Sequence, residues 1–119
     1  MPMTMQHERD NIYRVELGGH LQKVEFDRCQ EQLADEIGRI GPIRLLFVLQ
    51  GFEGWERGGQ WNDLSFYMRY GDQIEKIAIV GPERWRDDTT TFAVAGLRRA
   101  PVEFFTEDAL TGARTWLSS

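Results

Sequence analysis

The sequence predicts one α/β domain in which a mixed, mostly parallel sheet of about five strands is covered by four helices. Strand-like and helix-like segments alternate along the 119 residues, which fit a single domain over residues 1–119. Two continuous apolar runs indicate strands buried on both faces. Apolar stripes with helical spacing lie between and after these runs. The expected order of elements is β-β-α-β-α-β-α-β-α.

The first segment predicts a pair of short antiparallel strands. Apolar and polar residues alternate over residues 3–8 and again over residues 12–17, with the turn-forming sequence Arg-Asp-Asn at residues 9–11 between them. Gly18 and Gly19 are expected to end the second strand.

The next segment predicts an amphipathic helix from about residue 23 to the stop signal at Gly41-Pro42. Its apolar positions follow spacings of three and four: Phe26, Cys29, Leu33, Ile37 and Ile40. Cys29 is the single cysteine, so an internal disulfide is excluded. Its place in the apolar stripe favours a small buried side chain over a reactive thiol.

The rest of the chain alternates strands and helices. Residues 43–49 and 74–80 predict buried strands, with a glycine-rich loop over residues 50–59 and a short helix over residues 62–70. A helix is expected within residues 83–96, although its three consecutive threonines weaken it. A strand at residues 102–105 then precedes a last helix, for which Thr106 is the expected N-cap.

Charge and composition exclude several classes of function. The net charge is −5 and the only lysines are Lys23 and Lys76, so nucleic acid is not an expected partner. No apolar run approaches the roughly 20 residues of a membrane span, and residues 1–10 lack the apolar region of a signal peptide. The cytoplasm is the expected compartment, with peripheral association at a membrane surface left open.

The sequence offers no recognisable catalytic apparatus, so we expect no enzyme, no metal and no cofactor. The segment GFEGWERGG (residues 51–59) fits neither nucleotide-binding glycine pattern and lacks the required lysine. There is no GxSxG motif, and two histidines with one cysteine show no metal-ligand spacing. A carboxylate enzyme using Glu53 or Glu83 is the remaining catalytic alternative; Glu56, beside Trp55, is read as part of a polar loop.

The most unusual feature is an aromatic and apolar segment, in which eight large side chains fall within residues 52–70. A short helix with apolar groups on more than one face cannot bury them all against one sheet. We therefore expect an apolar or amphipathic ligand between this helix and the sheet, with Arg84 or Arg86 available to an anionic head group. The residues expected to line or cover the site are Phe52, Trp55, Trp61, Leu64, Phe66, Trp85 and Phe92.

Three alternatives for the aromatic segment stay open. It is core, or it contacts a partner protein or a second copy in a homodimer, or it touches a membrane interface.

Several motifs together resemble the bacterial SpoIIAA-like family of small proteins, whose fold is similar to the STAS domain. They are RLLFVLQGFEGW, W-x-D-L-x-F, EKIAIVG-x-x-x-W and VEFF, followed by a helix that contains a tryptophan. The resemblance covers residues 12–117 and implies a mixed sheet with four helices, no known catalysis, and helices able to open over a cavity. Residues 50–62 contain neither Ser nor Thr, so the phosphorylation mechanism of anti-sigma antagonists is not expected.

Overall fold

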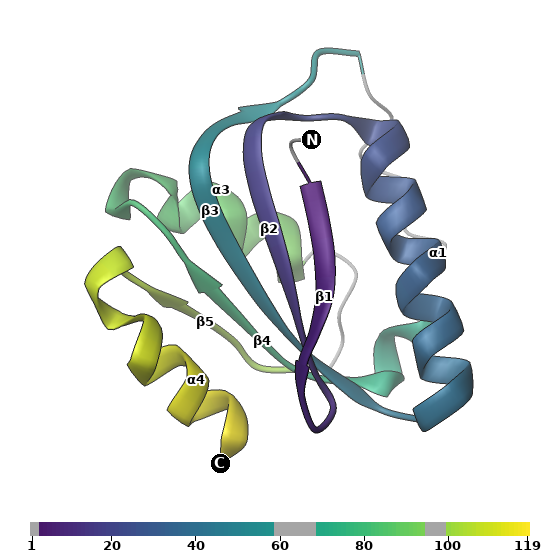
Figure 1. Ribbon diagram of the computed structural model, residues 1–119. Helices are drawn as coiled ribbons and strands as arrows, with labels where there is room; N and C mark the ends of the chain where they lie inside the picture. The colour runs from purple at the N-terminus through teal and green to yellow at the C-terminus, as the bar shows by residue number, and fades with distance from the viewer. Residues whose placement is uncertain (1–2, 59–68, 95–99) are drawn as a thin grey trace.

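The chain folds as one sheet of five strands with helices on both faces (Figure 1). The computed structural model describes residues 3–58, 69–94 and 100–119. The strands are β1 (Met3–Arg9), β2 (Ile12–Leu21), β3 (Ile43–Trp55), β4 (Ile74–Val80) and β5 (Val102–Phe105). The helices are α1 (Lys23–Ile40), α3 (Arg86–Val94) and α4 (Leu110–Ser118), and 3-10 turns occur at Gly71–Gln73, Glu83–Trp85 and Glu107–Ala109.

The strand order is β1-β2-β3-β4-β5. β1 is antiparallel to β2, and the three other neighbouring pairs are parallel. The predicted mixed, mostly parallel sheet is therefore confirmed. The described residues include three of the four expected helices. The helix expected at residues 62–70 falls largely outside the described residues, and of it only Arg69 and Tyr70 are described, both helical.

The two faces of the sheet bury different residues because side chains alternate along each strand. On β3, Ile43, Leu45 and Leu49 belong to the larger core under α1 and α3. Leu46 and Val48 belong to the smaller core under α4. This alternation explains the continuous apolar run of β3, because both of its faces are covered.

Two strand ends differ from the prediction. β2 continues past Gly18 and Gly19 to Leu21, and β3 continues past residue 49 to Trp55. The register shifts at Gly19, which lies opposite Phe52. Gly19, Gly51 and Gly54 have positive φ angles of 56°, 63° and 111°. These glycines allow both strands to bend and stay paired, whereas the sequence pattern had indicated turns.

The start of α1 is stabilised from a distance. Gln22 occupies the N-cap position and its side chain makes no capping hydrogen bond. Instead the backbone N–H of Lys23 donates to Oε1 of Glu56 at 2.8 Å. Because the Glu56 backbone N–H also donates to the carbonyl of Leu21, at 3.0 Å, this residue joins the ends of β2 and β3 to the helix. The other end of α1 is at Gly41, as predicted, with φ at 90°.

The last helix is fastened by two cations from the sheet. Arg44 of β3 donates to the backbone carbonyl of Leu117, and Lys76 of β4 donates to that of Trp116 at 2.9 Å. Cations at a helix C-terminus satisfy unpaired carbonyls and complement the helix dipole. Thr106 precedes this region as expected, but its hydroxyl bonds to the Asp108 carboxylate at 2.5 Å and caps no backbone N–H.

Candidate functional site

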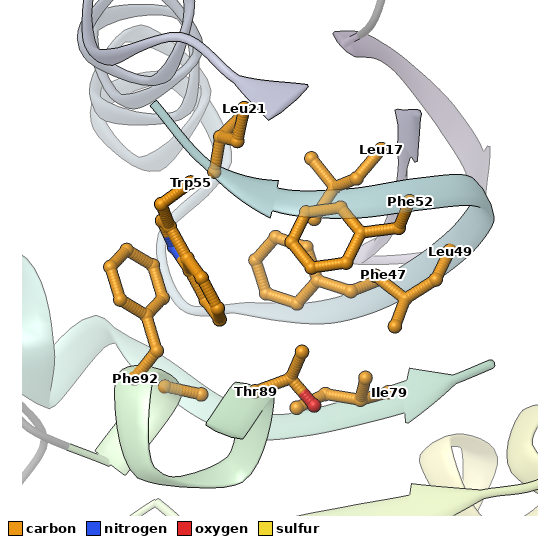
Figure 2. Close-up of a pocket in the computed structure, with 10 residues that line it drawn as sticks. Leu17, Leu21, Phe47, Leu49, Phe52, Trp55, Ile79, Thr89 and Phe92 are labelled. Carbon is orange, nitrogen blue, oxygen red and sulfur yellow. The ribbon is translucent and has the colours of Figure 1, made fainter. Parts of the chain in front are cut away.

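An apolar cavity lies between the sheet and α3, with a volume of about 30 Å³ (Figure 2). Its walls come from β2, β3, β4 and α3. The described lining residues are Leu17, Leu21, Phe47, Leu49, Phe52, Trp55, Ile79, Thr89, Phe92 and Ala93. A cavity of this size has room for about two water-sized molecules.

The lining offers little to a polar group. Thr89 is 6% exposed, and its hydroxyl donates to the Trp85 backbone carbonyl at 2.6 Å. That bond occupies the hydroxyl proton within α3 and its preceding turn. Trp55 brings the other polar side-chain atom among the described lining residues, its indole N–H.

An aromatic cluster of Phe52, Trp55, Trp85 and Phe92 borders the cavity. The ring centroids of Phe52 lie 5.3 Å from Trp55 and 4.9 Å from Trp85, both edge to face. Those of Trp55 and Phe92 lie 5.2 Å apart. A Cβ on Gly54 would meet the Trp85 ring at 3.5 Å. Edge-to-face packing at these distances is favourable, so the cluster is a packed unit.

Two indole N–H groups in this cluster have no hydrogen-bond partner among the residues that the structure describes. They are the Nε1 groups of Trp55 and Trp85, which are both buried and find no acceptor within residues 3–58, 69–94 and 100–119. Figure 2 shows the Trp55 nitrogen on the side of the indole that faces Phe92. A buried donor without an acceptor destabilises a fold by about 1–3 kcal/mol.

A second, more open depression adjoins the cavity. It has a volume of about 520 Å³, and its described lining residues are Trp55, Asp88, Thr91 and Phe92. Trp55 and Phe92 line both spaces. These two rings are therefore the described boundary between the apolar cavity and the depression.

The structure brings together four of the expected site residues, Phe52, Trp55, Trp85 and Phe92. Phe52 and Trp55 lie on β3 and not in a loop, and they are buried and half-buried, although the sequence pattern suggested exposed rings. Trp61, Leu64 and Phe66 lie outside the described residues.

The two candidate arginines are placed elsewhere. Nε of Arg86 donates to Oε1 of Glu83 at 2.8 Å, and its guanidinium lies 4.8 Å from the Phe104 ring centroid. Arg86 lines a separate depression, of about 380 Å³, together with Asp87 and Glu103. Arg84 is exposed and is not among the residues lining the described depressions.

Sequence reasoning missed the aliphatic wall of the cavity. Leu17, Leu49 and Ile79 come from three different strands and line the cavity opposite Ala93 of α3. Their signal was present as alternation within each strand. The sequence did not show which of the two sheet faces carries a space, because that depends on how closely α3 packs.

The remaining candidates for chemistry have structural surroundings. Cys29 is 5% exposed, and burial raises the pKa of its thiol to about 12, which keeps it protonated near neutral pH. Glu56 caps α1, and Glu53 is exposed on β3. Within residues 3–58, 69–94 and 100–119, no three or more His, Cys, Asp or Glu side chains are grouped to hold a metal ion. None of the described helices has the length and apolar character needed to cross a membrane.

Comparison with known proteins supports the fold. A family model described as SpoIIAA-like matches residues 12–118. The chain is similar to the crystal structure of an uncharacterised protein of the DUF3478 family with a SpoIIAA-like fold from Shewanella loihica PV-4. The TM-score is 0.72 at 19% sequence identity, over 97% of this chain and 91% of that one. No curated protein matches the chain.

Proposed function

The chain belongs to the SpoIIAA-like family, and from that premise we propose that it is a non-catalytic domain that binds an apolar or amphipathic small molecule between the sheet and α3. The observation that carries the proposal is the shared position of Trp55 and Phe92, which line both the apolar cavity and the open depression. An apolar space reached past two aromatic rings suits a hydrocarbon chain or ring.

Binding requires the site to open. The cavity holds about 30 Å³, whereas pockets for small molecules usually measure roughly 300–1,000 Å³. We propose that α3 moves away from the sheet and takes Phe92 with it. An apolar ligand would then fill the enlarged space and restore the contacts that the side chains lose.

The sequence and contacts of α3 support its role as the moving element. Thr89, Thr90 and Thr91 are β-branched, which lowers helix propensity. The hydroxyl of Thr90 is buried and has no partner in the described part of the chain, and that of Thr89 donates to the carbonyl of residue 85. Opening would also expose to solvent or ligand the buried indole N–H groups of Trp55 and Trp85, which lack an acceptor among the described residues. These features lower the free-energy cost of opening.

An interaction module, a homodimer and membrane association remain predictions from the sequence. Among the described residues, the large apolar side chains that are exposed are Val24 at 63% and Ile40 at 40%. They lie near opposite ends of α1 and form no patch that would favour one of these functions.

The test is uptake of an apolar molecule by the purified protein. Native mass spectrometry and an organic extract would show any molecule carried through purification, and titration with the neutral fluorescent probe N-phenyl-1-naphthylamine would measure binding. Ala93→Leu places a larger side chain into the cavity, so we expect at least a tenfold loss of probe affinity, about 1.4 kcal/mol. Ala34→Leu, on the half-buried part of α1, is the control, because Ala34 does not line the cavity.

Two results would overturn the proposal. One is a protein that carries no molecule and takes up no probe. The other is equal affinity in the wild type and in Ala93→Leu, when circular dichroism shows that the variant is folded.

A further inference from the structure

The open depression beside the cavity is where the polar end of a bound amphiphile would lie. A chain that passes between Trp55 and Phe92 has its apolar part among the cavity side chains and its other end among the residues of the depression. This placement of the polar end rests on the proposed function, in which the apolar part fills the cavity.

Among the residues that the structure describes, the lining of the depression carries one negative charge. Asp88 and Thr91 are three residues apart on α3, so both project toward the same side of the helix. Asp88 is exposed and is the one ionisable side chain among the described residues that line this space. An anionic head group placed here would be repelled by the carboxylate.

The nearby arginine does not neutralise this site. Arg86 pairs with Glu83 and lies over the Phe104 ring, and it lines the separate depression that also contains Asp87. Arg86 is therefore not among the described residues that line the open depression. The anionic head group that the sequence suggested therefore has no support from the position of Arg86.

A carboxylate beside two aromatic rings is suited to an organic cation. Ammonium groups are attracted to the faces of tryptophan and phenylalanine, and a neighbouring carboxylate adds direct attraction. We infer that the ligand of this domain is a cationic amphiphile of the alkylammonium class, whose head group lies between Asp88 and the rings of Trp55 and Phe92. The hydroxyl of Thr91 supplies an acceptor for an ammonium that carries N–H bonds.

Asp88 has a second role that the test must separate. Both Asp87 and Asp88 lie in the first turn of α3, where negative charge complements the helix dipole. Adjacent residues on a helix point about 100° apart, and Asp87 lines the other depression. Asp87→Asn and Asp88→Asn therefore remove the same charge from the same helix turn, but only Asp88→Asn changes the proposed head-group site.

The experiment measures displacement of N-phenyl-1-naphthylamine by three probes with the same alkyl chain: decyltrimethylammonium, decanol and decanoate, each below its micelle concentration. We expect the wild type to bind the cation most tightly and the anion least. Asp88→Asn should weaken the affinity for decyltrimethylammonium by about threefold and leave the affinity for decanol unchanged. Asp87→Asn should leave all three affinities unchanged, while thermal unfolding confirms that both variants are folded.

The outcomes separate this inference from the proposed function. Equal or tighter binding of decanoate, or identical effects of Asp87→Asn and Asp88→Asn, would overturn the cationic head group while apolar binding stands. Failure of all three probes, together with failure of the fluorescent probe, would overturn the proposed function and this inference with it.

Discussion

Replacing Phe52 by leucine should destabilise the fold by about 2–3 kcal/mol, mainly through the loss of ring contacts. Phe52 is 2% exposed, and leucine keeps most of its apolar volume, so the change in size should cost under about 1.5 kcal/mol. The ring makes edge-to-face contacts at 5.3 Å with Trp55 and 4.9 Å with Trp85. Each such contact contributes about 0.5–1.5 kcal/mol beyond buried area.

The free energy of unfolding should be measured by urea denaturation followed by far-ultraviolet circular dichroism, because the variant changes the surroundings of two tryptophans. An unchanged m-value would show that the midpoint reports stability alone. Phe104→Leu is the matched control: Phe104 is 8% exposed, and its ring faces the Arg86 guanidinium at 4.8 Å. Phe104→Leu should lower the free energy of unfolding by a smaller amount, about 1 kcal/mol.

A double-mutant cycle identifies the cause. If the ring contact matters, Phe52→Leu and Trp85→Leu should couple by about 0.5–1.5 kcal/mol. Additivity within about 0.3 kcal/mol would refute the argument that the rings of Phe52 and Trp85 stabilise one another.

Three further predictions concern other parts of the molecule. A Cβ on Gly81 would meet the Cβ of Leu49 at 2.8 Å, so Gly81→Ala should lower the urea midpoint by the equivalent of about 1–3 kcal/mol. A Cβ on Gly112 of α4 would meet no atom of the described residues within 4 Å, so Gly112→Ala should raise the midpoint. Hydrogen bonds from Arg39 and then Tyr13 lower the pKa of Glu36 from 4.5 to about 2, so this carboxylate stabilises the fold above about pH 4.5 and progressively less as the pH falls toward 2. Melting temperatures of Glu36→Gln should accordingly depend less on pH across that window, and equal slopes would contradict the assignment. Cys29 should react with a thiol reagent much more slowly in the native protein than in urea, because burial raises its pKa to about 12; equal rates would show that α1 opens readily.

The sheet was predictable because its evidence is local. Continuous apolar runs at residues 43–49 and 74–80 indicate the two buried strands. The helix α1 that covers the sheet is indicated by a stripe with helical spacing, from Phe26 to Ile37. The ends of β2 and β3 were not predictable in this way. Their glycines have positive φ angles that serve bends within paired strands, and the sequence does not distinguish such a bend from a turn.

The site was predictable only as a set of rings. Aromatic density next to strand ends singled out Phe52, Trp55, Trp85 and Phe92, whose rings the structure brings together. The polar surroundings were not predictable, since they depend on which way each residue of α3 points. Arg86 donates a hydrogen bond to Glu83, while Asp88 lines the open depression beside the cavity. Glu56, which the sequence left as a polar loop residue, caps a helix whose first residue is 33 positions away.

The strand order β1-β2-β3-β4-β5 has a consequence for how the protein is made. Each strand pairs with the strand that precedes it in the chain, so no strand must insert between two that are already joined. During synthesis the sheet can therefore grow by one strand at a time from the N-terminal hairpin. Until β4 leaves the ribosome, however, the apolar strand β3 is an open parallel edge. We expect chains halted between residues 55 and 74 to be the most prone to aggregate, and those halted after residue 105 to be protected.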